Sequence, residues 1–175
     1  MNDLRRQLDQ ILSGRVCLVG LGNPEHGDDG FGVRLAQEYS TAVASLAANP
    51  DETHAFVLMG GTQPESPMSR LPKDLDHVVF LDAVDFGGAP GAVILLGSTE
   101  MRSRYPQIST HRLSLGLLAQ LVECGTRTRA WLLGVQPESL KEGTTLSAPV
   151  EETLGLLCQL LTECVSPMSM EEQIA

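Results

Sequence analysis

The sequence predicts an α/β protein in which a five-stranded sheet lies between two layers of helices, a three-layer α/β/α sandwich. Two observations predict this fold. Five short runs are apolar along most of their length, which is typical of strands covered by helices on both faces. These runs alternate with segments in which apolar residues recur every three or four positions, the spacing of amphipathic helices. The 175 residues suit one domain, which we expect over residues 1–165, followed by a flexible polar tail at 166–175.

Each predicted strand is an apolar run bounded by turn or polar residues. The strands are expected at 15–21, 54–60, 76–83, 92–97 and 129–135. The third run is apolar until it reaches Asp82 at its end, and only the short turn DFGGAPG separates it from the fourth. Short glycine-rich and proline-rich segments of this kind are typical of turns between strands.

Four segments have helical spacing. They are 2–12, 30–48, 109–125 and 149–164. Asn49-Pro50 should end the second helix, because a proline disfavours the helical conformation in the residue that precedes it. Ser109 or Thr110 can cap the start of the third, and Gly125 can close it. The segment 98–108 has no clear pattern.

The charge and the apolar runs exclude several classes of protein. The net charge is −10 and no cluster of lysine or arginine offsets it, which argues against a nucleic-acid partner. The longest apolar runs fall far short of the roughly 20 residues of a membrane span, and the first residues do not resemble a signal peptide. The four cysteines form no CxxC pair, as expected for thiols in a reducing compartment. We therefore expect a soluble cytoplasmic protein without a membrane partner.

The loop GNPEHGDDGFG, residues 22–32, follows the first strand and leads into a helix. A glycine-rich turn at this place normally binds phosphate, with backbone N–H groups at the start of the helix. This loop instead carries Glu25, Asp28 and Asp29, whose carboxylates would repel a pyrophosphate. The loop therefore argues against a dinucleotide site and favours contact with a cation. The HExxH and GxSxG motifs of common hydrolases are missing from the sequence.

Candidates for a metal site come from three segments. Asp28 or Asp29 follows the first strand, Asp82 ends the third, and His111 lies in the first turn of the helix predicted at 109–125. Ligands of such sheets gather at the carboxyl ends of the strands, and a helix start favours the neutral imidazole that binds metal. Two carboxylates and an imidazole would suit a divalent ion such as zinc or nickel. Spacing alone leaves an ordinary structural role open for each, a turn or cap for the aspartates and a surface position for the histidine.

The other three histidines, His26, His54 and His77, receive only a structural interpretation. Gln136 also belongs to this edge of the predicted sheet, because it directly follows the fifth strand, but its sequence context assigns it no role.

Five sequence blocks, in order, resemble the [NiFe]-hydrogenase maturation endopeptidases. They are GNPEHGDDGFG, LMGGT, FLDAVDFGGAPG, STHRLSLGL and LLGVQPESL, and the resemblance covers about residues 15 to 160. The GGTQPES and GVQP loops are most similar to the branch that serves hydrogenases of the hydrogenase-3 type. The resemblance implies a phosphorylase/hydrolase-like sandwich with a mostly parallel mixed sheet, in which the fourth strand is antiparallel.

The resemblance also implies a reaction and a site. The family removes a C-terminal extension from the precursor of the hydrogenase large subunit once nickel has been inserted. Its metal-binding and catalytic positions fall on Asp29, Asp82 and His111, and the nickel is expected to arrive with the substrate. Two alternatives stay open: a zinc hydrolase with its own resident ion, and a non-catalytic module that only recognises nickel. No separate nucleophile is evident.

Overall fold

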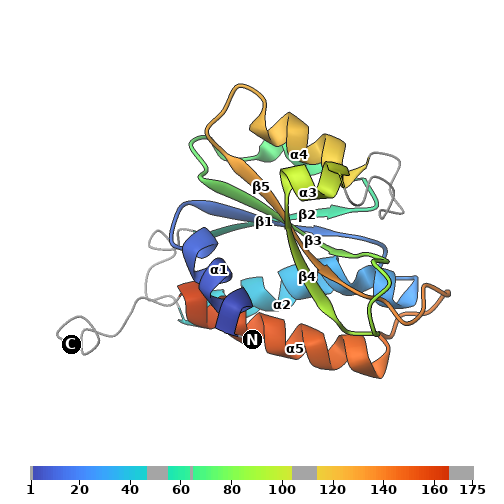
Figure 1. Ribbon diagram of the computed structural model, residues 1–175. Helices are drawn as coiled ribbons and strands as arrows, with labels where there is room; N and C mark the ends of the chain where they lie inside the picture. Colours follow the sequence, from blue (N-terminus) through green and yellow to red (C-terminus); the bar gives the residue numbers. More distant parts are fainter. Residues whose placement is uncertain (1, 47–54, 64, 104–113, 166–175) are drawn as a thin grey trace.

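The computed structural model describes residues 2–46, 55–63, 65–103 and 114–165. The described residues form a five-stranded sheet with the order β2-β1-β3-β5-β4. Its strands are β1 (Val16–Leu21), β2 (Ala55–Gly61), β3 (His77–Ala83), β4 (Val93–Gly97) and β5 (Arg129–Val135). The pairs β1–β2, β1–β3 and β3–β5 are parallel, whereas β4 runs antiparallel to β5 at one edge (Figure 1). The predicted mostly parallel mixed sheet is confirmed.

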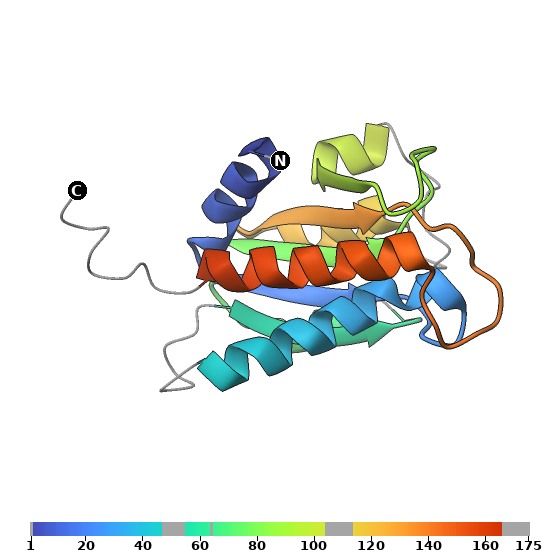
Figure 2. The same ribbon diagram turned by 90° about the horizontal axis from the view of Figure 1, so that it is seen from below.

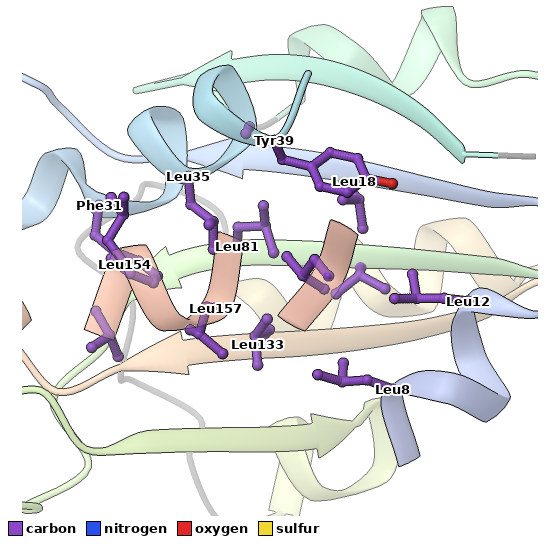
Figure 3. Close-up of a cluster of buried hydrophobic side chains, with 14 of the residues drawn as sticks. Leu8, Leu12, Leu18, Phe31, Leu35, Tyr39, Leu81, Leu133, Leu154 and Leu157 are labelled. Atoms are coloured by element: carbon purple, nitrogen blue, oxygen red, sulfur yellow. The ribbon is translucent and has the colours of Figure 1, made fainter. Parts of the chain in front are cut away.

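Helices cover both faces of this sheet, as predicted. One face is covered by α1 (Asn2–Leu12), α2 (Phe31–Leu46) and α5 (Ala148–Val165), and the other by α3 (Ser98–Ser103) and α4 (Leu115–Glu123) (Figures 1 and 2). Neighbouring residues of a strand point to opposite faces, so Leu81 of β3 joins one core cluster and Phe80 joins the other. Figure 3 shows the first cluster, in which Leu35 of α2 and Leu157 of α5 approach the sheet.

The strands begin and end within one residue of the predicted positions, and α1 matches its prediction. The short helix α3 lies in the segment for which the sequence predicts nothing. The predicted end of the second helix at Asn49-Pro50 and the predicted tail at 166–175 lie outside the described residues. No helix in the described part of the chain combines the length and apolar character that crossing a membrane requires.

The predicted start of the third helix is wrong. Ser114 has an extended backbone and acts as the N-cap of α4, where its Oγ accepts a hydrogen bond from Leu117 N at 3.2 Å. The apolar stripe that packs on the sheet begins at Leu115, and the capping residue directly precedes it. His111 therefore comes before α4 in the chain and is not in its first turn. At the other end, Gly125 has the positive φ of +69° that commonly closes a helix, as predicted.

Replacing Leu8 by alanine is expected to lower the free energy of unfolding by about 2–5 kcal/mol. Leu8 is fully buried in the cluster that joins α1 to α5 and the sheet (Figure 3). The truncation removes apolar surface that folding buries away from water, and it leaves a cavity that the surrounding side chains fill only in part. Urea unfolding measures the change. Leu156→Ala is the matched control, because Leu156 is 58% exposed and its truncation should change the stability by less than about 0.5 kcal/mol.

Candidate functional site

The candidate site lies at the carboxyl ends of β1 and β3, where the glycine-rich loop leaves β1. Gly22 follows β1 with a φ of +109°, and its N–H donates to Gly61 O at 2.9 Å. A Cβ added at Gly22 would overlap the carbonyl oxygen of Asp29 and would lie 3.8 Å from Oδ1 of Asp82. Gly22 is therefore close to both the backbone carbonyl of Asp29 and the carboxylate of Asp82, and the structure brings these two predicted residues to the same edge of the sheet.

Asp29 is held by the loop itself. It belongs to the short 3-10 helix η1 (Gly27–Gly30), and its Oδ2 accepts a hydrogen bond from Asn23 N at 2.9 Å. The following helix approaches the strands very closely, because a Cβ at Gly32 would overlap the carbonyl oxygen of Leu81. The glycines at 22 and 32 thus allow a close packing that a side chain would prevent. Asp29 is 8% exposed.

Asp82 lies on a central strand of the sheet. β3 pairs with β1 on one side and β5 on the other, and Asp82 is opposite Gly134 in the register with β5. The residue is completely buried. Burying a carboxylate is costly unless other groups pair with it. Asp82 is therefore a buried acid at the carboxyl end of a central strand, the place where ligands of such sheets bind, and this position favours a role in the site.

The third predicted site residue, His111, lies outside the described residues, and its contribution stays a prediction. Within the part of the chain that the structure describes, no three histidine, cysteine or acidic residues are close enough to hold a metal ion together. The two placed carboxylates therefore need a further ligand, from a residue outside the described part or from a bound partner, before they can hold an ion.

Asp28, next to Asp29, has a different environment. Its carboxylate is 1% exposed and accepts four hydrogen bonds: from the N–H groups of Glu138, Ser139 and Ser147 at 2.8, 3.0 and 2.6 Å, and from the Ser147 hydroxyl at 2.8 Å. Burial alone would raise the pKa of Asp28, but these hydrogen bonds outweigh it and hold the pKa below its usual value. Asp28 is thus held by hydrogen bonds from residues far along the chain, which the sequence could not name.

Gln136 organises the next loop along the same edge. Its Nε2 donates to Asp85 Oδ1 at 3.0 Å, and its Oε1 accepts from the N–H groups of Phe86 and Gly88 at 2.9 and 3.1 Å. The side chain therefore fixes the turn between β3 and β4, which begins just after Asp82. Sequence reasoning placed Gln136 at this edge and missed this role. The available signal was an amide residue at the end of a buried strand, where its polar groups need partners.

The histidine at the start of β3 has the structural role that the sequence predicts for it. His77 Nδ1 accepts a hydrogen bond from Trp131 Nε1 at 3.0 Å. Burial lowers the pKa of His77 and favours its neutral form. The residue lies at the amino end of the strand, opposite to the edge that carries Asp82. His54 lies outside the described residues.

The depressed pKa of Asp28 predicts an acid-dependent contribution to stability. The ionised carboxylate favours the folded state above the unfolded pKa of about 3.9, and this contribution is lost as the pH falls through the folded pKa. The difference in unfolding free energy between the wild type and Asp28→Asn should therefore be largest above about pH 4 and narrow in stronger acid. Urea unfolding at a series of pH values tests this. Glu152→Gln, at an exposed position of α5, controls for the general effect of removing one charge.

Comparison with known proteins gives one consistent result. The family model described as hydrogenase maturation protease matches residues 41–164. The hydrogenase expression/formation protein HupD of Bradyrhizobium diazoefficiens is 29% identical over 158 residues, which cover 85% of this chain and 79% of HupD. The hydrogenase 3 maturation protease of Escherichia coli is 26% identical over 147 residues, covering 82% and 86% of the two chains. Since relatives of both kinds match, the predicted hydrogenase-3 branch stays a prediction.

Solved structures agree with this result. The crystal structure of the [NiFe] hydrogenase maturation protease HycI from Thermococcus kodakarensis superposes with a TM-score of 0.76 at 30% identity, covering 92% of this chain and 99% of that one. The hydrogenase maturating endopeptidase HybD from Escherichia coli has a TM-score of 0.66 at 27% identity, covering 83% and 88%. With the glycine-rich loop, Asp29 and Asp82 at the carboxyl edge of the same sheet, the chain belongs to the hydrogenase maturation protease family and is a protease.

Proposed function

We propose that this protease removes the C-terminal extension from the precursor of a [NiFe]-hydrogenase large subunit after nickel has been inserted. Membership of the family supports the reaction. The observation that carries the proposal for nickel is the packing around Gly22, which is close to both the backbone carbonyl of Asp29 and the carboxylate of Asp82. Both residues stand at the sheet edge where ligands of α/β proteins bind.

In this proposal, Asp29, Asp82 and His111 contact the nickel ion that the precursor carries. Carboxylate and imidazole ligands suit a divalent transition ion, and the set lacks the thiolates that seal a tight structural zinc site. Three ligands leave coordination positions for the groups by which the precursor already holds its ion. The enzyme thereby distinguishes a loaded precursor from an unloaded one and cleaves at the correct stage.

The test uses purified precursor in nickel-loaded and nickel-free forms, with product masses measured after incubation. The loaded form should lose its C-terminal extension, and the nickel-free form should stay intact. Efficient cleavage of nickel-free precursor would contradict the proposal. Loss of activity when a resident zinc is stripped, with recovery when zinc returns, would instead favour a zinc hydrolase. Binding without any cleavage would favour a nickel-recognition module.

His111→Ala is the matching variant. It should weaken the preference for loaded precursor while its thermal unfolding stays close to that of the wild type. A variant that processes loaded precursor at the wild-type rate would remove His111 from the proposed site.

We also propose that processing takes place in the cytoplasm. All four cysteines of the chain lie within the described residues and are free thiols, which suits a reducing compartment. Detection of the protein in the cytosolic fraction of its cells would support this, and detection in a secreted fraction would contradict it.

A further inference from the structure

The loop between β5 and α5, residues 136–147, packs along the glycine-rich loop of the candidate site. Gly143 makes two backbone hydrogen bonds to it: its O accepts from Gly27 N at 2.7 Å, and its N–H donates to Glu25 O at 2.8 Å. The N–H of Asp28 also donates to Ser139 O at 3.1 Å. The side chain of Arg34 adds a hydrogen bond to Thr144 O. The two loops therefore lie side by side at the carboxyl edge of the sheet, next to Asp29.

The buried carboxylate of Asp28 holds this loop in place by hydrogen bonds. It accepts three hydrogen bonds from backbone N–H groups of the loop, near its start and at its end, and one from the Ser147 hydroxyl. Asp29 depends on different contacts, because its side chain accepts from Asn23 N and its backbone packs on Gly22. The neighbouring aspartates thus hold different structures: Asp29 belongs to the candidate site, and Asp28 fixes the loop beside it.

The middle of the anchored loop faces solvent. Leu140 is 42% exposed, and the residues from Lys141 to Thr145 are exposed as well. Hydrogen bonds fix the backbone on both sides of Leu140, at Ser139 and at Gly143. A surface that is already ordered loses little conformational entropy when a partner binds, and an exposed apolar side chain on it can be buried with a gain in free energy.

We propose that the segment 138–145 is the surface on which the enzyme holds the polypeptide of its precursor beside the site. Leu140 is the contact residue, and Asp28 is a positioning residue that fixes the segment in the shape that binds. The partner is the hydrogenase large-subunit precursor, so this inference rests on the proposed function.

The experiment compares steady-state cleavage of nickel-loaded precursor by the wild type, Leu140→Ser and Asp28→Asn. Both variants should raise KM about tenfold and leave kcat close to the wild-type value, because they weaken binding without changing Asp29 or Asp82. In Asp28→Asn, an NH2 group replaces one of the carboxylate oxygens that accept hydrogen bonds from the loop. Because this group is a donor and faces backbone N–H donors, hydrogen bonds are lost and the loop is no longer fixed. The control is Leu156→Ser, an exposed leucine on α5 that should change neither constant.

The split between KM and kcat separates positioning from mere stability. If a substitution only unfolds a fraction of the enzyme molecules, the apparent kcat falls and the KM stays at the wild-type value. This result for Asp28→Asn would overturn its positioning role. Unchanged KM in Leu140→Ser would overturn the docking surface.

Affinity for the loaded precursor, measured in the Asp29→Asn background where no cleavage is expected, separates this inference from the proposed function. If the wild type does not cleave but Leu140→Ser still weakens binding about tenfold, the docking surface stands and the proposed function fails. If the precursor does not bind to the enzyme with Asp29 intact either, both fail.

Discussion

Asp29→Asn is expected to abolish processing of the precursor, lowering the cleavage rate at least about a hundredfold at every precursor concentration. The asparagine keeps the shape of the side chain and an oxygen that can accept the hydrogen bond from Asn23 N, so the loop should stay folded. The change removes the negative charge that the proposed contact with nickel requires. Product masses report the loss of cleavage, and circular dichroism with thermal unfolding reports that the fold persists.

Asp28→Asn is the matched control for this prediction, because it makes the same chemical change one residue earlier. It should leave cleavage at saturating precursor close to the wild-type rate. If instead Asp28→Asn abolishes cleavage and Asp29→Asn is silent, the assignment of roles within the loop is wrong by one residue.

Gly22→Ala is expected to destabilise the protein by about 3 kcal/mol or more. A φ of +109° is strained for a residue with a side chain, and the new Cβ would overlap the carbonyl oxygen of Asp29. Relief of the overlap requires the backbone at Asp29 or at residue 22 to shift, which changes the position of Asp29 relative to Asp82, so the molecules that still fold should also cleave more slowly. Urea unfolding measures the first effect, and the rate per folded molecule measures the second.

Gly125→Ala separates the effect of backbone strain at a positive φ from the effect of the overlap between the new Cβ and a neighbouring atom. Gly125 also has a positive φ, of +69°, but no atom lies within 4 Å of an added Cβ. This variant should lose only about 1–2 kcal/mol and keep its activity. Equal losses in the two variants would show that the packing between Gly22 and Asp29 contributes nothing beyond backbone strain.

The periodic elements, and the position of Asp29 and Asp82 at one edge of the sheet, could be predicted from the sequence. The sequence predicts β5 at 129–135, and it lies at Arg129–Val135, because a strand between two helical layers is apolar along most of its length and ends where polar residues begin. Asp82 could be proposed as a candidate because it is a charged residue at the end of an otherwise apolar strand. The loop after β1 could be proposed because it carries carboxylates where a phosphate-binding loop could not, and the family resemblance selected Asp29 within it.

The sequence by itself determined which residues repeat with the period of a strand or helix, and which polar residues follow the strands, because both properties depend on near neighbours in the chain. Only the tertiary structure decided the partners of those polar residues. Asp28 binds Ser147, 119 positions away in the chain, and Gln136 binds Asp85, 51 positions away. Ser114 likewise became the cap of α4, in place of the earlier serine and threonine, because the apolar stripe that packs on the sheet begins right after it. Such choices depend on which loops the packed layers bring together, and no local pattern encodes that arrangement.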